Sequence, residues 1–211
     1  MTEASKAQII RPRDVDDAIL RIRDMLGPGC RLATFSGFSS AGYEDEAFVE
    51  GRLLELLSAL DPTADVVCSG ATSVGIGLVY TLAKSPSLPN AFKTIGIVSS
   101  QALREQVPFS DDVDCVFVIE DDQWGGYLDN GTTLSPTSRV MVEASDIFFF
   151  IGGGEIARDE YACADVLGKS LHFDATDMKH ETAIEKARRK GEAPPTDFAG
   201  AVFTYRKAMA R

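Results

Sequence analysis

The 211-residue chain has few basic residues and no long apolar run. Its 21 Lys and Arg stand against 32 Asp and Glu, which gives a formal net charge of −11 at pH 7. Because this charge would repel a phosphate backbone, we expect no nucleic acid as a partner. No window approaches the roughly 18 apolar residues that a membrane helix needs, so no membrane contact is expected. The first residues also lack the apolar core of a signal peptide, and a cytoplasmic protein is therefore predicted.

Clustered metal ligands and the two standard phosphate motifs are also missing. The chain has 2 His and 4 Cys without a CxxC pair, so we expect neither a metal site nor a bound cofactor. In the turn GATSVGIG, a P-loop would need Lys and then Ser or Thr after its last glycine, but Gly75 is followed by Ile76. The GxGxxG fingerprint of dinucleotide binding does not follow the first main strand. Hydrolysis of a nucleoside triphosphate is therefore not expected.

What the chain does have is a regular alternation of strand and helix patterns. Residues 147–151 (IFFFI) are apolar and run into three glycines, which is typical of a strand buried on both faces. Further strands are expected at 31–35, 65–69, 92–98, 114–119 and 170–173. Helices are expected at 14–26, from 44–46 to about 60, and at 78–84, 135–145, 156–167, 179–190 and 198–209. This order predicts a doubly wound α/β fold with a mostly parallel, Rossmann-like sheet and helices on both faces.

The chain is long enough for one main domain with additions at its ends. We predict an N-terminal helix packed on the domain within residues 1–30. A nucleotide-binding domain would span residues 31–178, and a helical extension would span residues 179–211.

Three predicted strands end in loops rich in glycine and small polar residues. Because parallel strands place their carboxyl ends at one edge of the sheet, these loops should meet there. Glycine lets a ligand approach the main-chain amides, and a helix that begins near Glu155 would offer unpaired N–H groups to an anion. The candidate ligand-binding residues are Ser36, Gly37, Ser39 and Ser40, then Gly70, Ala71, Thr72 and Gly75, and finally Gly152, Gly153, Gly154 and Glu155. Any one of these loops, taken alone, could equally be a plain strand-to-helix turn.

Four segments, in their order along residues 31–174, resemble the SLOG superfamily of Rossmann-like nucleotide binders. They are SGFSS, VVCSGATSVGIG, SRVMVEASD and IGGGEIARDE. That group includes the Lonely Guy-type phosphoribohydrolases, which carry GGxGTxxE where this chain has IGGGEIARDE. The resemblance implies that Arg139 and Glu160 form a catalytic pair, with Arg139 facing the ligand. It also implies that the three glycines hold a nucleotide phosphate and that the protein is a homodimer.

Two departures from that motif leave the activity open. Ile156 and Ala157 replace the Gly and Thr of the family, and in the other possible register Asp159 takes the position of the acid. Our first hypothesis is therefore a sensor or binding protein for a nucleotide or a nucleotide-derived phosphoribosyl ligand. The alternatives are a nucleoside 5′-monophosphate phosphoribohydrolase, which cleaves the N-glycosidic bond, and a non-catalytic assembly or scaffold protein.

The acidic segment 120–133 carries the single tryptophan of the chain, Trp124. If this segment folds over the site, Trp124 and Tyr127 could stack on a base. The alternative is that they pin the loop onto the core.

Overall fold

The computed structural model describes residues 7–129 and 131–210. The sheet consists of β1 (Gln8–Ile10), β2 (Arg31–Gly37), β3 (Asp65–Ser69), β4 (Thr94–Ser99), β5 (Cys115–Ile119), β6 (Ile147–Ile151) and β7 (Ser170–Asp174). The helices are α1 (Val15–Leu26), α2 (Glu46–Ser58), the short 3₁₀ turn η1 (Gly75–Gly77), α3 (Leu78–Ala83), α4 (Gln101–Arg104), α5 (Pro136–Ala144), α6 (Glu155–Val166), α7 (His180–Lys190) and α8 (Gly200–Met209). Within these residues, no helix combines the length and the hydrophobicity that crossing a bilayer requires.

The strands form one sheet in the order β1-β5-β4-β3-β2-β6-β7, and every strand pairing among the described residues is parallel. From β2 the chain adds β3, β4 and β5 on one side, then crosses back and adds β6 and β7 on the other. The direction of winding therefore reverses between β2 and β6. In such sheets a ligand crevice opens at this point, outside the carboxyl ends of the strands.

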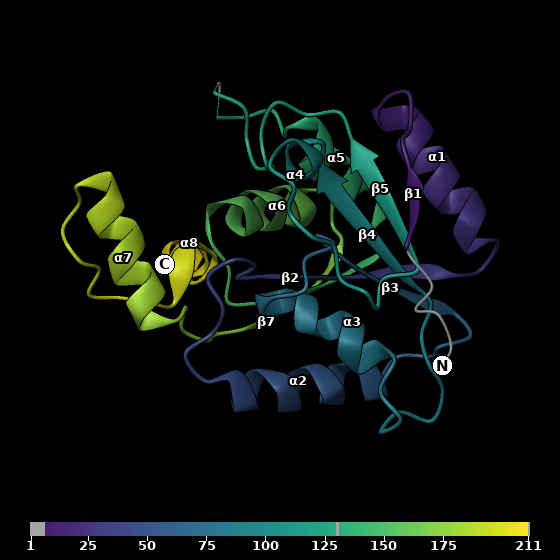
Figure 1. Ribbon diagram of the computed structural model, residues 1–211, viewed down its shortest axis with the longest axis horizontal. Helices are drawn as coiled ribbons and strands as arrows, with labels where there is room; N and C mark the ends of the chain where they lie inside the picture. Colours follow the sequence, from purple (N-terminus) through teal and green to yellow (C-terminus); the bar gives the residue numbers. More distant parts are fainter. Residues whose placement is uncertain (1–6, 130, 211) are drawn as a thin grey trace.

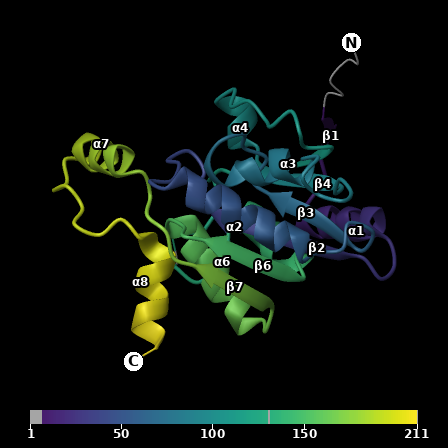
Figure 2. The same cartoon turned by 90° about the horizontal axis from the view of Figure 1, so that it is seen from below.

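Helices cover both faces of the sheet, as Figures 1 and 2 show. Because side chains alternate along a strand, Phe149 and Ile151 pack on the side of α2 and α3. Phe148 and Phe150 pack on the opposite side, with α1, α5 and α6. Each buried phenylalanine contributes roughly 1.5–3 kcal/mol through burial. The predicted doubly wound α/β fold is confirmed.

Two short elements were not predicted. Strand β1 pairs with β5 at the edge of the sheet and has only three residues, too few for an alternating pattern to be visible. Helix α4 has four residues and lies between β4 and β5. Neither contributes one of the three glycine loops.

The C-terminal segment forms the helices α7 and α8, at the left of Figure 1. Helix α8 packs on α6 through Val202, which is fully buried, and the Arg206 guanidinium lies 4.6 Å from the centre of the Phe173 ring. Just before α7, Met178 forms a bridge to Tyr43 and the Lys179 amide donates to the Gly42 carbonyl at 3.2 Å. This segment is thus attached to the loop that follows β2.

Candidate functional site

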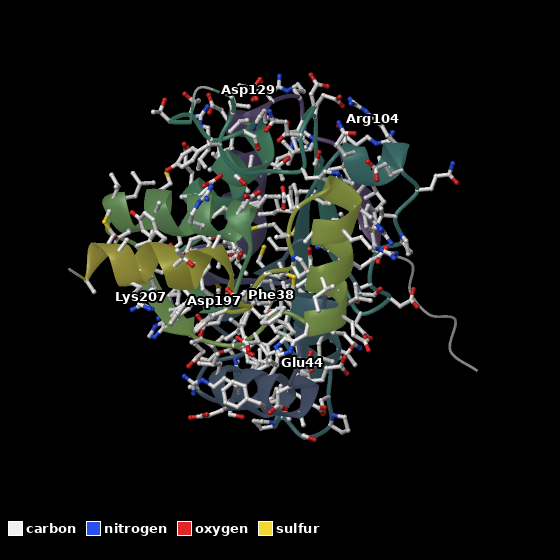
Figure 3. The ribbon with its side chains drawn as sticks, turned by 90° about the vertical axis from the view of Figure 1, so that its left-hand side faces the viewer. Phe38, Glu44, Arg104, Asp129, Asp197 and Lys207 are labelled. Atoms are coloured by element: carbon white, nitrogen blue, oxygen red, sulfur yellow. The ribbon has the colours of Figure 1, made fainter. Side chains whose placement is uncertain are left out.

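A cavity of about 650 Å³ lies at the carboxyl ends of β2, β3, β4 and β6. All three glycine loops contribute to its lining. The predicted site residues that line it are Ser36, Gly37, Ser39, Ser40, Gly70, Thr72, Gly154, Glu155 and Glu160. Figure 3 views the molecule from the side of α7 and α8, with Phe38 of the cavity wall labelled between these helices.

The loops after β2 and β6 are held together by the buried hydroxyl of Tyr43. It accepts a hydrogen bond from the Phe38 amide at 3.2 Å and donates one to the Ile151 carbonyl at 3.0 Å. Gly37 is required at this crossing, because a Cβ there would lie 2.5 Å from the Ile151 carbonyl oxygen. Burial raises the pKa of the Tyr43 phenol, so the hydroxyl keeps its proton and remains a donor.

Three of the predicted glycines, Gly75, Gly152 and Gly153, approach the protein itself rather than the cavity. A side chain on Gly75 would collide with the carbonyls of Phe38 and Ser39. Gly152 adopts φ 59° and packs on Phe38 and Thr176. Gly153 adopts φ 126° and packs on Ala157 and Val202. Of the three consecutive glycines, only Gly154 lines the cavity. The other two allow close packing of the chain, including that of the C-terminal segment.

Ala71 also lies beneath the cavity wall. It is fully buried and has φ 58°, a left-handed conformation that is uncommon for a residue with a Cβ. Its amide donates to the Tyr80 hydroxyl at 3.2 Å, and its carbonyl accepts from the Ser110 amide at 2.9 Å. These bonds hold the strained turn so that Gly70 and Thr72, on either side, reach the cavity.

Arg139 does not face the cavity, contrary to what the resemblance implies. Its Nε donates to Glu143 Oε1 at 2.7 Å, and its terminal nitrogen donates to Asp16 Oδ1 of α1 at 3.0 Å. The residues of α5 that line the cavity include Thr137 and Met141. At about 100° per residue, Arg139 is turned some 200° away from Thr137. Arg139 therefore connects α5 to α1, and its expected contact with a ligand is corrected.

Glu160 does line the cavity, and it is 5% exposed. Its Oε1 accepts a hydrogen bond from the Ser138 hydroxyl at 2.7 Å, and its Oε2 accepts one from the Ser36 hydroxyl at 3.3 Å. Burial raises the pKa of Glu160 to about 7, although the two hydroxyl hydrogen bonds oppose this change. Glu160 can therefore both hold and release a proton near neutral pH.

The neighbouring acid, Asp159, has a different role. Its Oδ1 is paired with the Arg158 guanidinium at 2.7 Å, and its Oδ2 accepts the Tyr127 amide at 2.9 Å. Asp159 thus holds the loop that carries Trp124. Of the two registers considered for the acid, the structure brings Glu160 to the cavity.

The loop between β5 and α5 is pinned through its backbone. Besides the Tyr127 amide, the Gly126 amide donates to the Ser138 hydroxyl at 2.8 Å. The Trp124 side chain lines the cavity and is 42% exposed. The loop is thus fixed next to the cavity, whereas stacking of Trp124 on a base remains a prediction.

Sequence reasoning missed the hydroxyl residues Ser69, Thr137 and Ser138. Ser69 is the last residue of β3, directly before the predicted Gly70, and its position at a strand end was an available signal. Thr137 and Ser138 lie in the first turn of α5, just before Arg139. Ser69 and Thr137 line the cavity, and their side-chain oxygens are buried with no hydrogen-bond partner among the described residues.

The rest of the lining is largely apolar. It includes Phe38, Ile76, Ile97, Val98, Ala102, Val107, Pro108, Phe109 and Met178. The charged residues in the lining are Glu105, Glu155, Glu160 and Lys186. An apolar wall with a few convergent polar groups, in a volume of this size, is typical of a small-molecule site.

No protein-family model matches the sequence, and no curated protein is significantly similar to it. Solved structures do match. One is the structural-genomics target TM1055, at 19% identity and a TM-score of 0.46, over 67% of this chain and 72% of that chain. Another is the molybdenum cofactor carrier protein from Chlamydomonas reinhardtii, at 17% identity and a TM-score of 0.48, over 86% of this chain and 99% of that chain.

The all-parallel sheet that reverses its winding between β2 and β6 is the Rossmann-like architecture that the resemblance to the SLOG superfamily implied.

Proposed function

We propose that the cavity binds a nucleotide or a nucleotide-derived phosphoribosyl ligand, and that the protein acts as a sensor or binding protein. The observation that carries this proposal is the convergence of the loops after β2, β3 and β6 on one cavity at the switch point of the sheet. Doubly wound sheets bind their ligands at this position.

The start of α6 supports a phosphate at one end of the cavity. This helix of 12 residues begins after Gly154, which has no side chain to cap it. The first N–H groups of a helix have no partner within the helix, and the helix dipole adds positive potential there. Gly154, Glu155 and Ala157 all line the cavity at this point. The exposed hydroxyls of Ser39 and Ser40 and the Lys186 side chain line it as well and would add donors.

The apolar part of the lining supports a flat ring in the same cavity. Ile97, Val107 and Phe109 line the cavity together with Trp124. An aromatic side chain with an exposed face can stack on a base with little dependence on its identity, at about 1–3 kcal/mol per base. A ligand with one charged and one aromatic end thus matches the two kinds of lining.

Thermal unfolding with a panel of ligands tests this proposal. The panel consists of the nucleoside 5′-monophosphates of adenine, guanine, cytosine and uracil, with the free nucleosides as controls without phosphate. A ligand at 100 times its dissociation constant should stabilise the protein by about 2.7 kcal/mol. We expect at least one monophosphate to raise the unfolding temperature far more than its nucleoside does. If no member of the panel raises it, the binding proposal fails and the scaffold alternative gains support.

Glu160 supports a second candidate function, phosphoribohydrolase activity. Cleavage of an N-glycosidic bond develops positive charge on the ribose, and a carboxylate beside it can stabilise that charge or activate water. A buried acid with a pKa of about 7 suits this chemistry. In the phosphoribohydrolases an arginine acts together with this acid. Arg139, which the resemblance assigned to that role, is bound to Asp16 of α1 instead.

Release of free base from the monophosphates tests the activity. Glu160→Gln should abolish release while the ligand still raises the unfolding temperature. Asp165→Asn, at an exposed position of the same helix outside the cavity lining, should retain release. If the unchanged protein releases no base from a monophosphate that it binds, the protein is a binder and not this enzyme.

The homodimer and the cytoplasmic location also remain predictions, and native mass spectrometry tests the first of them.

A further inference from the structure

The side chains that line the cavity carry more negative than positive charge. Glu105, Glu155 and Glu160 line it, and Lys186 is the only lysine or arginine among the described lining residues. A phosphate monoester carries about 1.5–2 negative charges near neutral pH, so these carboxylates would repel it. The first amides of α6 offset part of this repulsion. Lys186 is the lining side chain that can offset the rest.

The arginines on the elements around the cavity are engaged elsewhere. Arg158 pairs with Asp159 at 2.7 Å, and Arg104 pairs with Asp122 at 3.2 Å. Arg139 connects α5 to α1, as described above. None of these three arginines lines the cavity. The position of Lys186 therefore decides whether a side-chain cation reaches a bound phosphate.

Lys186 lies on α7, in a segment that leaves the domain and returns to it at one point. There the Met178 amide donates to the Phe198 carbonyl at 2.8 Å. The rings of His180 and Phe198 stack with 4.0 Å between their centroids, and the His180 amide donates to Glu44 Oε2 at 2.8 Å. Both ends of the segment are thus fixed to the loop that follows β2, and α7 lies between them.

The buried face of α7 consists of small side chains. Among its described residues, the buried ones are Ala183 and Ala187, each 8% exposed, and neither belongs to the two core clusters. Glu185 pairs with Arg188 at 2.7 Å and with Arg189 at 3.1 Å, so these ion pairs stay within the helix. Figures 1 and 2 show α7 at the edge of the molecule, apart from the helices that cover the sheet. A helix held through two alanines can move relative to the domain at a small cost in free energy.

Lys186 lies at the border of this buried face. At 100° per residue, it is about 60° from Ala183 around the helix axis, whereas Arg189 is about 120° away. The side chains of Arg188 and Arg189 are 78% and 75% exposed. Of the basic side chains that the structure describes on α7, Lys186 is therefore the one that a movement of the helix would bring against a ligand.

We propose that α7 is a lid over the cavity, which closes on a phosphorylated ligand and pairs the Lys186 ammonium with the phosphate. This inference rests on the proposed function and adds the element that completes the site. Met178, at the base of the lid, also lines the cavity, so one segment contributes an apolar and a charged contact. Closure of a lid excludes water, which strengthens a charge pair beneath it.

Calorimetry tests the role of Lys186 with adenosine 5′-monophosphate, ribose 5-phosphate and adenosine. The proteins are the unchanged chain, Lys186→Gln and Arg189→Gln. Both substitutions remove one positive charge from an exposed position of α7, but only Lys186 lines the cavity. We expect Lys186→Gln to weaken binding of the two phosphorylated ligands about tenfold and to leave that of adenosine unaffected. Arg189→Gln should leave all three affinities unchanged.

Hydrogen exchange of α7 tests the movement. Saturating adenosine 5′-monophosphate should slow exchange of the amides of residues 183–189 about tenfold in the unchanged protein, whereas saturating adenosine should not. In Lys186→Gln the same amides should exchange as in the free protein, even when the monophosphate saturates the site.

The outcomes separate this inference from the proposed function. Equal effects of the two substitutions, or an unchanged affinity in Lys186→Gln, overturn the role of Lys186 while nucleotide binding stands. Exchange that is not slowed by a saturating monophosphate overturns the lid, and nucleotide binding again stands. Absence of binding by all three ligands overturns both the lid and the proposed function.

Discussion

Glu160 is the residue on which the chemistry of the cavity depends. It is buried and hydrogen-bonded by two serines, and its pKa is raised to about 7. Its motif lies directly after the glycine loop, and the helix that begins after Gly154 brings Glu160 to the cavity. The same reasoning failed for Arg139, since a motif does not show which side of a helix a residue occupies. One position earlier, Ser138 reaches Glu160, while Arg139 reaches α1.

The raised pKa of Glu160 predicts a pH-dependent stability. The folded protein holds this proton up to about pH 7, whereas the unfolded chain loses it near pH 4.3. The folded state binds more protons between these values, so the free energy of unfolding should fall as pH rises through this window. Glu160→Gln removes this fall in the free energy of unfolding. Above pH 7 the variant should therefore be more stable than the unchanged protein by about 3 kcal/mol. Urea unfolding at pH 5 and pH 8 measures the difference, with Glu155→Gln as the control; an equal pH dependence in Glu160→Gln would contradict the assignment.

Ser138 should help to keep that pKa as low as it is. Its hydroxyl accepts the Gly126 amide at 2.8 Å, which leaves its proton directed at Glu160 Oε1, 2.7 Å away. Because a hydrogen bond to the charged form lowers the pKa of an acid, Ser138→Ala should raise the pKa of Glu160 further. Carbon-detected NMR titration of the Glu160 carboxyl measures this change. A pKa that stays the same in the variant would show that Ser138 has no such effect.

At the scale of elements, the strands were more predictable than the loops between them. Strand β6 was found with its exact bounds because an uninterrupted apolar run is visible when both faces are buried. The pattern did not show that Gly152 and Gly153 serve internal packing, since glycine is equally suited to a ligand and to a neighbouring segment. Nor did it show that Tyr43, seven residues after Ser36, links the loops after β2 and β6.

Removing the Tyr43 hydroxyl should therefore weaken the site as well as the fold. Tyr43→Phe leaves the Phe38 amide and the Ile151 carbonyl without their buried partner, which should lower the free energy of unfolding by about 1–3 kcal/mol. It should also weaken ligand binding, because Phe38 and its neighbours line the cavity. Chemical denaturation measures the first effect, with Tyr205→Phe, outside this network, as the control. Equal stability of the two variants would show that the hydroxyl does not hold the loops together.

At the scale of the whole molecule, topology determines where the site lies. The rule for parallel strands predicted that the three loops would share an edge, and they line one cavity there. The docking of the C-terminal segment could not be predicted, because it depends on distant contacts. The Val202 amide donates to the Gly153 carbonyl at 3.3 Å, and a Cβ on Gly153 would lie 2.9 Å from the Val202 side chain.

Gly153→Ala should consequently release α8 from the domain. At φ 126° an alanine is strained, and its methyl group would lie 2.8 Å from the Ala157 methyl. We expect a lower unfolding temperature and faster proteolytic cleavage before α8, compared with Gly131→Ala. Gly131 also has a positive φ, but no atom lies near the position of its Cβ. Equal cleavage rates in the two variants would contradict this role of Gly153.

The central claim is that the three loops jointly hold a phosphorylated ligand in the cavity. The most direct measurement is an amide NMR titration of the protein with adenosine 5′-monophosphate and with ribose 5-phosphate. The account predicts that the amides of Ser39, Thr72 and Gly154 shift together, with one dissociation constant for each ligand. It would be contradicted if these amides stayed unmoved at saturating ligand, or if the shifts were confined to the separate groove between Phe48 and Phe203.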